Sequence, residues 1–267
     1  MIKPYGHLDD NICALIRVKP VRDFVMHFVI KETLKFLAIN SLLAVCTFAQ
    51  DPVKPAELNV LFIGNSLTYV NDLPEMVKVI AKHNGKKFKY KMVAYPDLSL
   101  EDHWAKGDAV KAIKDGKWDF VVLQQGSSAL PASRTNLIEQ VGRFTPEIRA
   151  VGAKPALFMV WPFESRKFDF DRVHESYELA AKAADGIFLP AGESWRAAWK
   201  QKPDLQLYSD GLHATALGSY LAAGVIYKVL YNESIFELPA KLKAGPVKID
   251  LSPQEKDLAR QAMIDAR

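Results

Sequence analysis

The chain has 267 residues, of which 49% are hydrophobic and 25% are charged, a composition that is typical of a globular protein with a sizeable core. Its formal net charge of +4 is small for this length, and no cluster of lysine and arginine is dense enough to indicate a nucleic-acid-binding surface. We therefore expect one large α/β domain or two small ones, with no nucleic acid among its partners.

The first fifty residues differ from the rest of the chain. An apolar stretch at residues 36–49 follows basic residues and ends in small side chains of the kind that a signal peptidase recognises. This pattern predicts a secretory signal peptide that starts at Met26, after an upstream extension, and is cleaved near Ala49 or Gln50. The mature protein is then expected to be secreted or periplasmic, without membrane contact. The stretch is short for a membrane span, and an uncleaved anchor is the alternative.

Both cysteines of the chain, Cys13 and Cys46, lie in this N-terminal region. The mature protein is therefore expected to have no disulfide framework and no thiol chemistry. Residues 43–46 are also close to a lipoprotein acceptor pattern. Val45 is larger than the small residue expected before such a cysteine, so lipidation at Cys46 is the less favoured alternative.

From Asp51 onward, apolar strand-like segments alternate with segments of helical period. The predicted strands span about residues 59–63, 88–94, 118–123, 155–161 and 187–190. The predicted helices span about residues 73–83, 100–115, 134–151, 170–184, 193–200 and 214–231, and a further helix begins after Ser252-Pro253. This alternation predicts an α/β fold, a three-layer α/β/α sandwich with a central parallel sheet of about five strands. With no repeat or linker to divide it, the segment 51–267 is expected to be a single domain with a polar tail from about residue 239.

Ser66 lies where the first predicted strand passes into the first helix. It follows Gly64-Asn65, and Asn71 and Asp72 can cap the helix that comes next. At the carboxyl edge of a parallel sheet, backbone N–H groups converge and favour negative charge. A serine at this position can be a nucleophile whose oxyanion is stabilised by nearby amides, or it can simply cap the loop.

A serine nucleophile needs a histidine as general base within hydrogen-bond reach, and that histidine needs an orienting acceptor. Four of the six histidines follow residue 50, and two of these, His83 and His174, have structural explanations at a helix end and among charged neighbours. His103 follows the second strand on the ligand-binding edge and competes for the role of base. His213 precedes the last long helix, and Asp210 three residues upstream allows one turn to carry both base and orienter. The combination favours His213.

These residues resemble the SGNH hydrolase superfamily, also called the GDSL-type esterases and lipases. Residues 64–68, Gly-Asn-Ser-Leu-Thr, resemble the block that carries its nucleophile, and residues 210–213, Asp-Gly-Leu-His, resemble the Asp-x-x-His block that completes its triad. The two blocks bracket nearly all of residues 58–230. The resemblance implies the flavodoxin-like fold of that superfamily and a carboxylic ester hydrolase. It also implies a triad of Ser66, His213 and Asp210 that needs no cofactor and no metal ion.

The middle blocks of the superfamily are matched less well. Its second block has a glycine whose N–H holds the oxyanion. This chain has Asp97 there, whose own N–H can serve if the backbone angles suit an L-residue. Its third block has an asparagine donor, which the carboxamide of Gln124, or of Gln125 as second choice, is expected to replace. The predicted oxyanion hole is therefore Ser66, Asp97 and Gln124, although a glutamine at a strand end can also just cap a loop.

The superfamily acts on many esters, so the substrate is the least determined feature. We expect an exported serine esterase that removes short acyl groups, acetyl above all, from a small-molecule or carbohydrate ester. The alternatives are a lipid or thioester hydrolase of the same superfamily and a non-catalytic carbohydrate-binding relative. The expected substrate contacts are Asn65, Gln125, His103 and Trp161. Nothing in the sequence predicts the oligomeric state.

Overall fold

The computed structural model of the chain describes residues 57–233 and 236–267. The predicted signal peptide, its cleavage site and both cysteines lie outside the described residues, so these remain predictions. Over the described residues, no helix combines the length and apolar character that crossing a membrane would require.

Five parallel strands form the central sheet, as predicted. They are β1 (Glu57–Gly64), β2 (Lys87–Ala94), β3 (Phe120–Leu123), β4 (Lys154–Phe158) and β5 (Ile187–Leu189), in the spatial order β2-β1-β3-β4-β5. Residues 60–63 of β1 are fully buried because the strand is covered on both faces, which explains why this segment is continuously apolar. The order places a topological switch point between β1 and β3, where open α/β sheets bind their ligands.

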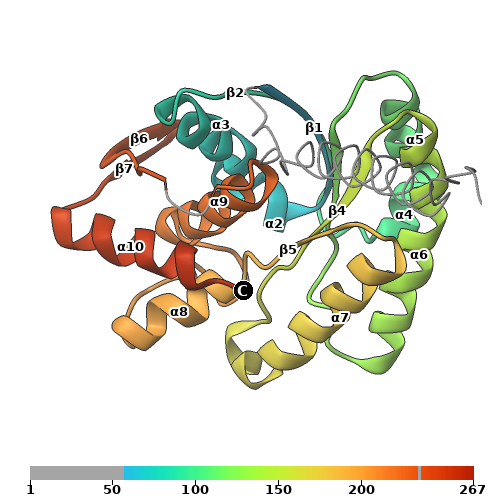
Figure 1. Ribbon diagram of the computed structural model, residues 1–267. Helices are drawn as coiled ribbons and strands as arrows, with labels where there is room; N and C mark the ends of the chain where they lie inside the picture. The colour runs from blue at the N-terminus through green and yellow to red at the C-terminus, as the bar shows by residue number, and fades with distance from the viewer. Residues whose placement is uncertain (1–56, 234–235) are drawn as a thin grey trace, which may run out of the picture. The chain divides into compact units, whose positions relative to one another are not determined.

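Helices cover both faces of the sheet and complete the predicted α/β/α sandwich (Figure 1). On one face lie α4 (Leu100–Lys106), α5 (Asp108–Lys114), α6 (Pro131–Ala150) and α7 (Phe170–Ala183). On the other lie α3 (Leu73–His83), α8 (Glu193–Gln201) and α9 (Ala216–Leu230). The helix expected over residues 100–115 is broken into α4 and α5 because Gly107 takes a φ of 82°, a left-handed conformation that ends the first helix.

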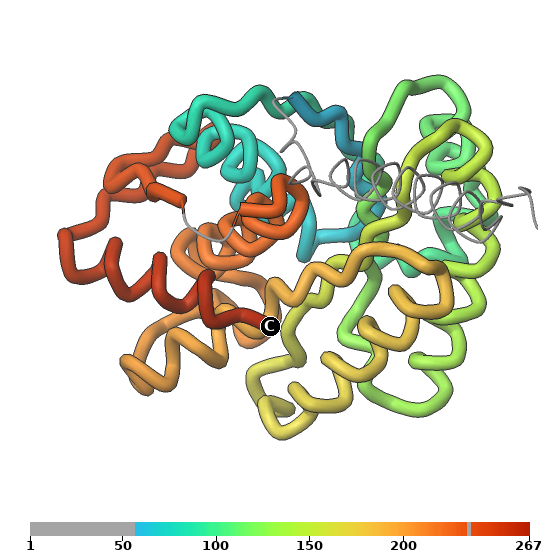
Figure 2. Tube along the Cα trace, in the orientation of Figure 1, coloured from blue at the N-terminus to red at the C-terminus, as the bar shows by residue number. Residues whose placement is uncertain are grey.

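The C-terminal tail contains more regular structure than its polar composition predicted. An antiparallel hairpin of β6 (Lys241–Ala244) and β7 (Val247–Asp250) precedes α10 (Pro253–Asp265). The predicted start of α10 is confirmed, with Ser252 and Glu255 forming a reciprocal capping box. Figure 2 shows α10 running beside α8 and α9, on which it packs. The Lys228 ammonium of α9 donates to three carbonyls at the end of α10 and so fixes that end to the domain.

Candidate active site

Ser66 is the first residue of a short helix, α2 (Ser66–Tyr69), that starts one residue after β1 ends. Asn65 caps this helix, because its Oδ1 accepts the N–H of Leu67 at 3.1 Å and its carbonyl accepts the N–H of Thr68 at 2.9 Å. The N–H of Ser66 lies at the helix N-terminus, where no intrahelical acceptor exists. Within the part of the chain that the structure describes, this N–H has no other acceptor. It is therefore available to a developing negative charge at the switch point.

Ser66, His213 and Asp210 form one hydrogen-bonded line. The Ser66 Oγ lies 2.9 Å from Nε2 of His213, and Nδ1 of His213 lies 2.6 Å from Oδ2 of Asp210. The other oxygen of Asp210 accepts the backbone N–H groups of Leu212 and His213 at 3.0 and 2.7 Å. The hydrogen bond to the His213 side chain, followed by these two, lowers the pKa of Asp210 to about 2. An ionised Asp210 places the ring proton on Nδ1, so that Nε2 can accept the hydroxyl proton of Ser66.

The loop that carries His213 is held at both of its ends and in its middle. Tyr208 and Ala214 pair as an antiparallel bridge around it. Gly211 takes a φ of 85°, which an L side chain would find strained, and its carbonyl accepts the N–H of Glu164 at 2.8 Å. The segment that follows β4 therefore supports the loop that carries His213.

His103, the alternative candidate for the base, binds the backbone at the end of β1 and does not face Ser66. Its side chain is fully buried, and its Nε2 lies 2.8 Å from the carbonyl oxygen of Gly64, to which it donates. Burial lowers the pKa of His103, so the ring stays neutral. The ring therefore anchors the end of β1, and the prediction of His103 as a substrate contact is wrong.

The buried His103 predicts a dependence of stability on pH. Protonation of this ring is opposed in the folded chain only, so the free energy of unfolding should fall as the pH drops below 6.5, the ordinary pKa of a histidine. Between pH 7.5 and 5.5, the free energy of unfolding of His103→Gln should therefore fall by about 1 kcal/mol less than that of wild type. Urea unfolding of both proteins at the two pH values measures this. The exposed His83 supplies the control, since His83→Gln should keep the wild-type dependence. An unchanged dependence in His103→Gln would contradict the assignment.

Gln124 cannot be the oxyanion donor that was predicted. Its side chain has no exposed surface. Its Oε1 accepts the N–H of Asn65 at 2.9 Å and the Thr68 hydroxyl at 2.7 Å. Its two amide hydrogens are used by Asn65 Oδ1 at 2.9 Å and by the carbonyl of Gln125 at 2.5 Å. The orientation of the carboxamide is determined because a backbone N–H only donates, so the atom that faces it must be oxygen.

Gln124 instead clamps the turn on which Ser66 lies. A Cβ atom at position 64 would clash with Gln124 Oε1 and Thr68 Oγ1, so glycine is what allows this close approach. Gly64 and Gln124 thus form one structural unit that fixes the start of α2. This correction follows from tertiary contacts, because the sequence shows only a glutamine at a strand end.

Asp97 meets the backbone condition that the sequence left open. It lies in the turn after β2 with a φ of 60°, in the left-handed region that favours glycine and that aspartate tolerates better than most residues. The residue is exposed, and its N–H has no acceptor among residues 57–233 and 236–267. Its part in an oxyanion hole stays a prediction.

The other three predicted substrate contacts are largely buried. Trp161 is fully buried, stacks on Trp195 with ring centroids 4.0 Å apart, and donates its Nε1–H to the carbonyl of Leu212 at 2.8 Å. It therefore supports the loop of the base, and its prediction as a substrate contact is wrong. Asn65 and Gln125 retain 7% and 4% of their surface, so their contact with substrate stays a prediction.

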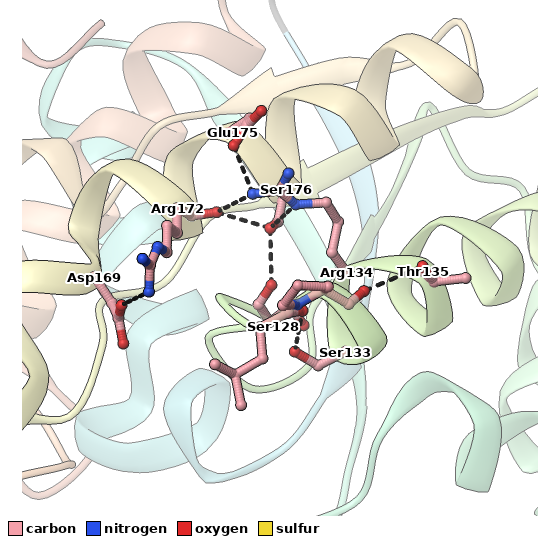
Figure 3. A network of polar contacts seen from close by, with 10 residues as sticks. Ser128, Ser133, Arg134, Thr135, Asp169, Arg172, Glu175 and Ser176 are labelled. Atoms are coloured by element: carbon pink, nitrogen blue, oxygen red, sulfur yellow. Dashed lines mark hydrogen bonds and ion pairs between the residues drawn. The ribbon is translucent and has the colours of Figure 1, made fainter.

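A polar network that the sequence did not reveal holds the loop after β3 (Figure 3). The carbonyl of Ser128 accepts the hydroxyl of Ser176 at 2.8 Å, and that hydroxyl accepts Nε–H of Arg134 at 2.9 Å. Arg134 also pairs with Glu175 at 2.6 Å. Tyr177 donates its hydroxyl to the carbonyl of Gln125 at 2.7 Å. Helices α6 and α7 thus fix the loop that follows the clamp residue Gln124.

The described residues include no group of three or more histidine, cysteine or acidic side chains arranged to hold a metal ion.

Comparisons with known proteins agree with this arrangement at the level of the fold. No protein-family model and no curated protein matches the sequence. The structure is similar to a protein from Slackia heliotrinireducens assigned as an SGNH hydrolase, with 25% identity, a TM-score of 0.57 and coverage of 65% of this chain and 99% of that one. It is also similar to a lipase/acylhydrolase from Enterococcus faecalis, with 18% identity, a TM-score of 0.53 and coverage of 66% and 96%. An acetylxylan esterase from Geobacillus stearothermophilus shares 14% identity, with a TM-score of 0.52 and coverage of 67% and 96%.

Proposed function

This chain belongs to the SGNH hydrolase superfamily, and on that premise we propose that it is an exported serine esterase that removes short acyl groups, acetyl above all, from carbohydrate. The observation that carries the proposal is the hydrogen-bonded line from Ser66 through His213 to Asp210 at the switch point of the sheet. A serine, a neutral imidazole acceptor and an ionised carboxylate in this order are the parts that acyl transfer needs. Export rests on the apolar stretch at residues 36–49, outside the described residues.

The geometry supports a two-step reaction. Nε2 of His213 takes the proton of Ser66 while Oγ attacks the ester carbonyl carbon, and the carbonyl electrons move onto oxygen. As the tetrahedral intermediate collapses, the C–O bond to the alcohol breaks and the alcohol leaves with the proton from His213. Water then attacks the acyl-serine and gives a proton to His213. The bond between the acyl carbon and Ser66 Oγ breaks, His213 returns the proton to that oxygen, and the acid is released. Asp210 stays ionised and stabilises the imidazolium in both steps.

The free backbone N–H groups of Ser66 and Asp97 are the proposed oxyanion donors. The first lies at a helix N-terminus, whose dipole favours a negative charge. The second comes from the neighbouring strand end, since β2 pairs with β1 as far as Gly64 and Ala94. With Gln124 excluded, the hole is built from main chain alone.

The carbohydrate ester is favoured by the acetylxylan esterase from Geobacillus stearothermophilus among the similar structures. The test is an acetate-release screen over acetylated xylan and acetylated sugars, combined with p-nitrophenyl esters of two to ten acyl carbons. We expect acetate release and a rate that falls with acyl length. Faster turnover of the long esters would favour the lipid or thioester hydrolase, as in the similar lipase/acylhydrolase. No turnover, together with carbohydrate binding, would favour the non-catalytic relative.

Asp97 allows a direct test of the main-chain hole. Asp97→Gly keeps the N–H, suits the left-handed φ and removes a negative charge close to the oxyanion, so kcat for p-nitrophenyl acetate should stay within about threefold of wild type or rise. Asp97→Val puts a β-branched residue at the same φ, and we expect it to lose about tenfold in kcat or more through displacement of the turn. Steady-state kinetics of both variants measures this. Equal activity in the valine variant would contradict a role for this backbone position.

A further inference from the structure

The link between the nucleophile helix α2 and α3 is conformationally costly. Asn71 and Asp72 are consecutive non-glycine residues with φ of 59° and 52°, both in the left-handed region. Such backbone persists where the surrounding structure over-determines it, and it concentrates at functional sites. The predicted role in capping α3 does not account for it, because Asp72 occupies the N-cap position but its side chain makes no capping hydrogen bond.

The side chain of Asn71 is directed to the segment that carries the base. Its Nδ2 donates one hydrogen to the carbonyl of Ala214 at 2.9 Å and the other to the hydroxyl of Ser219 at 2.9 Å. Ala214 directly follows His213, and Ser219 is the fourth residue of α9. Both acceptors belong to buried residues and Asn71 is half-buried, so the two hydrogen bonds are partly shielded from water.

Packing alone does not require this contact. Helices α3 and α9 contact each other, and both carry completely buried apolar side chains, among them Met76 and Ile80 of α3 and Val225 of α9. The bridge between Tyr208 and Ala214 closes the base loop on itself but does not connect it to α2. Asn71, five residues after Ser66, connects the two segments because its side chain binds the carbonyl of Ala214, the residue next to His213.

We propose that Asn71 is a positioning residue that holds His213 against Ser66 by binding the backbone of Ala214. The inference rests on the proposed esterase function and concerns the 2.9 Å contact between Ser66 Oγ and His213 Nε2. A displacement of about 1 Å between reacting groups can cost about 100-fold in rate, so a tether one residue from the base acts on kcat. The left-handed backbone of Asn71 is what directs its carboxamide across to α9.

The variant Asn71→Gly removes the side-chain hydrogen bonds of Asn71 without imposing strain on the left-handed backbone at this position. Glycine accepts the left-handed φ, so the fold should be retained, while both hydrogen bonds are lost. We expect kcat for p-nitrophenyl acetate to fall about 30-fold with KM within twofold, and labelling of Ser66 by a fluorophosphonate to slow by a similar factor. Asn71→Asp keeps the shape but turns a carboxylate toward the carbonyl oxygen of Ala214, which can only accept, and should lose at least as much activity.

Asn232 supplies the matched control, since it is an exposed asparagine with a φ of 53° at the end of α9. Asn232→Gly should leave kcat and labelling unchanged. If Asn71→Gly keeps wild-type kcat, or if its loss disappears when activity is expressed per folded molecule, the inference is overturned while the esterase function stands. If wild type neither hydrolyses esters nor labels at Ser66, the proposed function fails, and the inference fails with it.

Discussion

Ser66→Ala is expected to lower kcat/KM for p-nitrophenyl acetate by about 10⁴-fold or more, the largest effect of any single change in this chain. The variant removes the hydroxyl that lies 2.9 Å from Nε2 of His213, so the acyl-enzyme of the proposed mechanism cannot form. His213→Ala should cost a similar factor. The double variant should be no worse than either single one, because residues that act as a unit are not additive in their effects.

The measurement is steady-state turnover together with fluorophosphonate labelling and circular dichroism of each variant. Ser133 of α6 supplies the control, because its hydroxyl donates to a carbonyl within its own helix start and lies outside the triad. Ser133→Ala should keep wild-type turnover. Residual activity in Ser66→Ala within tenfold of wild type would show that another group is the nucleophile.

Gln124→Leu is expected to reduce both stability and activity strongly. Leucine cannot satisfy the N–H of Asn65, the hydroxyl of Thr68 or the carboxamide oxygen of Asn65, all of which now bind Gln124. Each unsatisfied buried group costs about 1–3 kcal/mol, so we expect a loss of about 3 kcal/mol or more in the free energy of unfolding. Because the turn that carries Ser66 is released, kcat should fall by about 100-fold.

Urea unfolding and steady-state kinetics distinguish this clamp from an oxyanion donor. A donor would lose kcat with little change in stability, whereas a clamp loses both. Gln140, another buried glutamine, accepts a single side-chain hydrogen bond from Arg143, so Gln140→Leu should cost only about 1 kcal/mol and leave kcat unchanged. A normal free energy of unfolding in Gln124→Leu would contradict the clamp.

The alternation of strands and helices could be predicted because it is written in local periodicity. The segment 60–63 is apolar throughout and buried on both faces, and α3 begins and ends at the predicted Leu73 and His83. Gly107 was the exception, since a glycine within a helical pattern does not reveal whether its φ is left-handed. The hairpin of β6 and β7 was missed because its alternating charges resemble a solvated tail.

Residue types and spacing predict the part of the candidate site that is local in the chain. Asp210 and His213 belong to one turn, and Ser66 follows directly on a buried strand, so their types and spacing already indicated a triad. The sequence favoured His213 over His103, and the folded chain shows that His213 faces Ser66 while His103 binds the carbonyl of Gly64. The folded chain also shows that Gln124 clamps the turn of Ser66 and that Asn71 reaches Ala214. The partners of these hydrogen bonds are separated by 59 and by 143 positions in the sequence, so the bonds depend on how the strands and helices pack. Periodicity reports which face of an element is buried, but the partners of a buried polar group are set by the assembled fold.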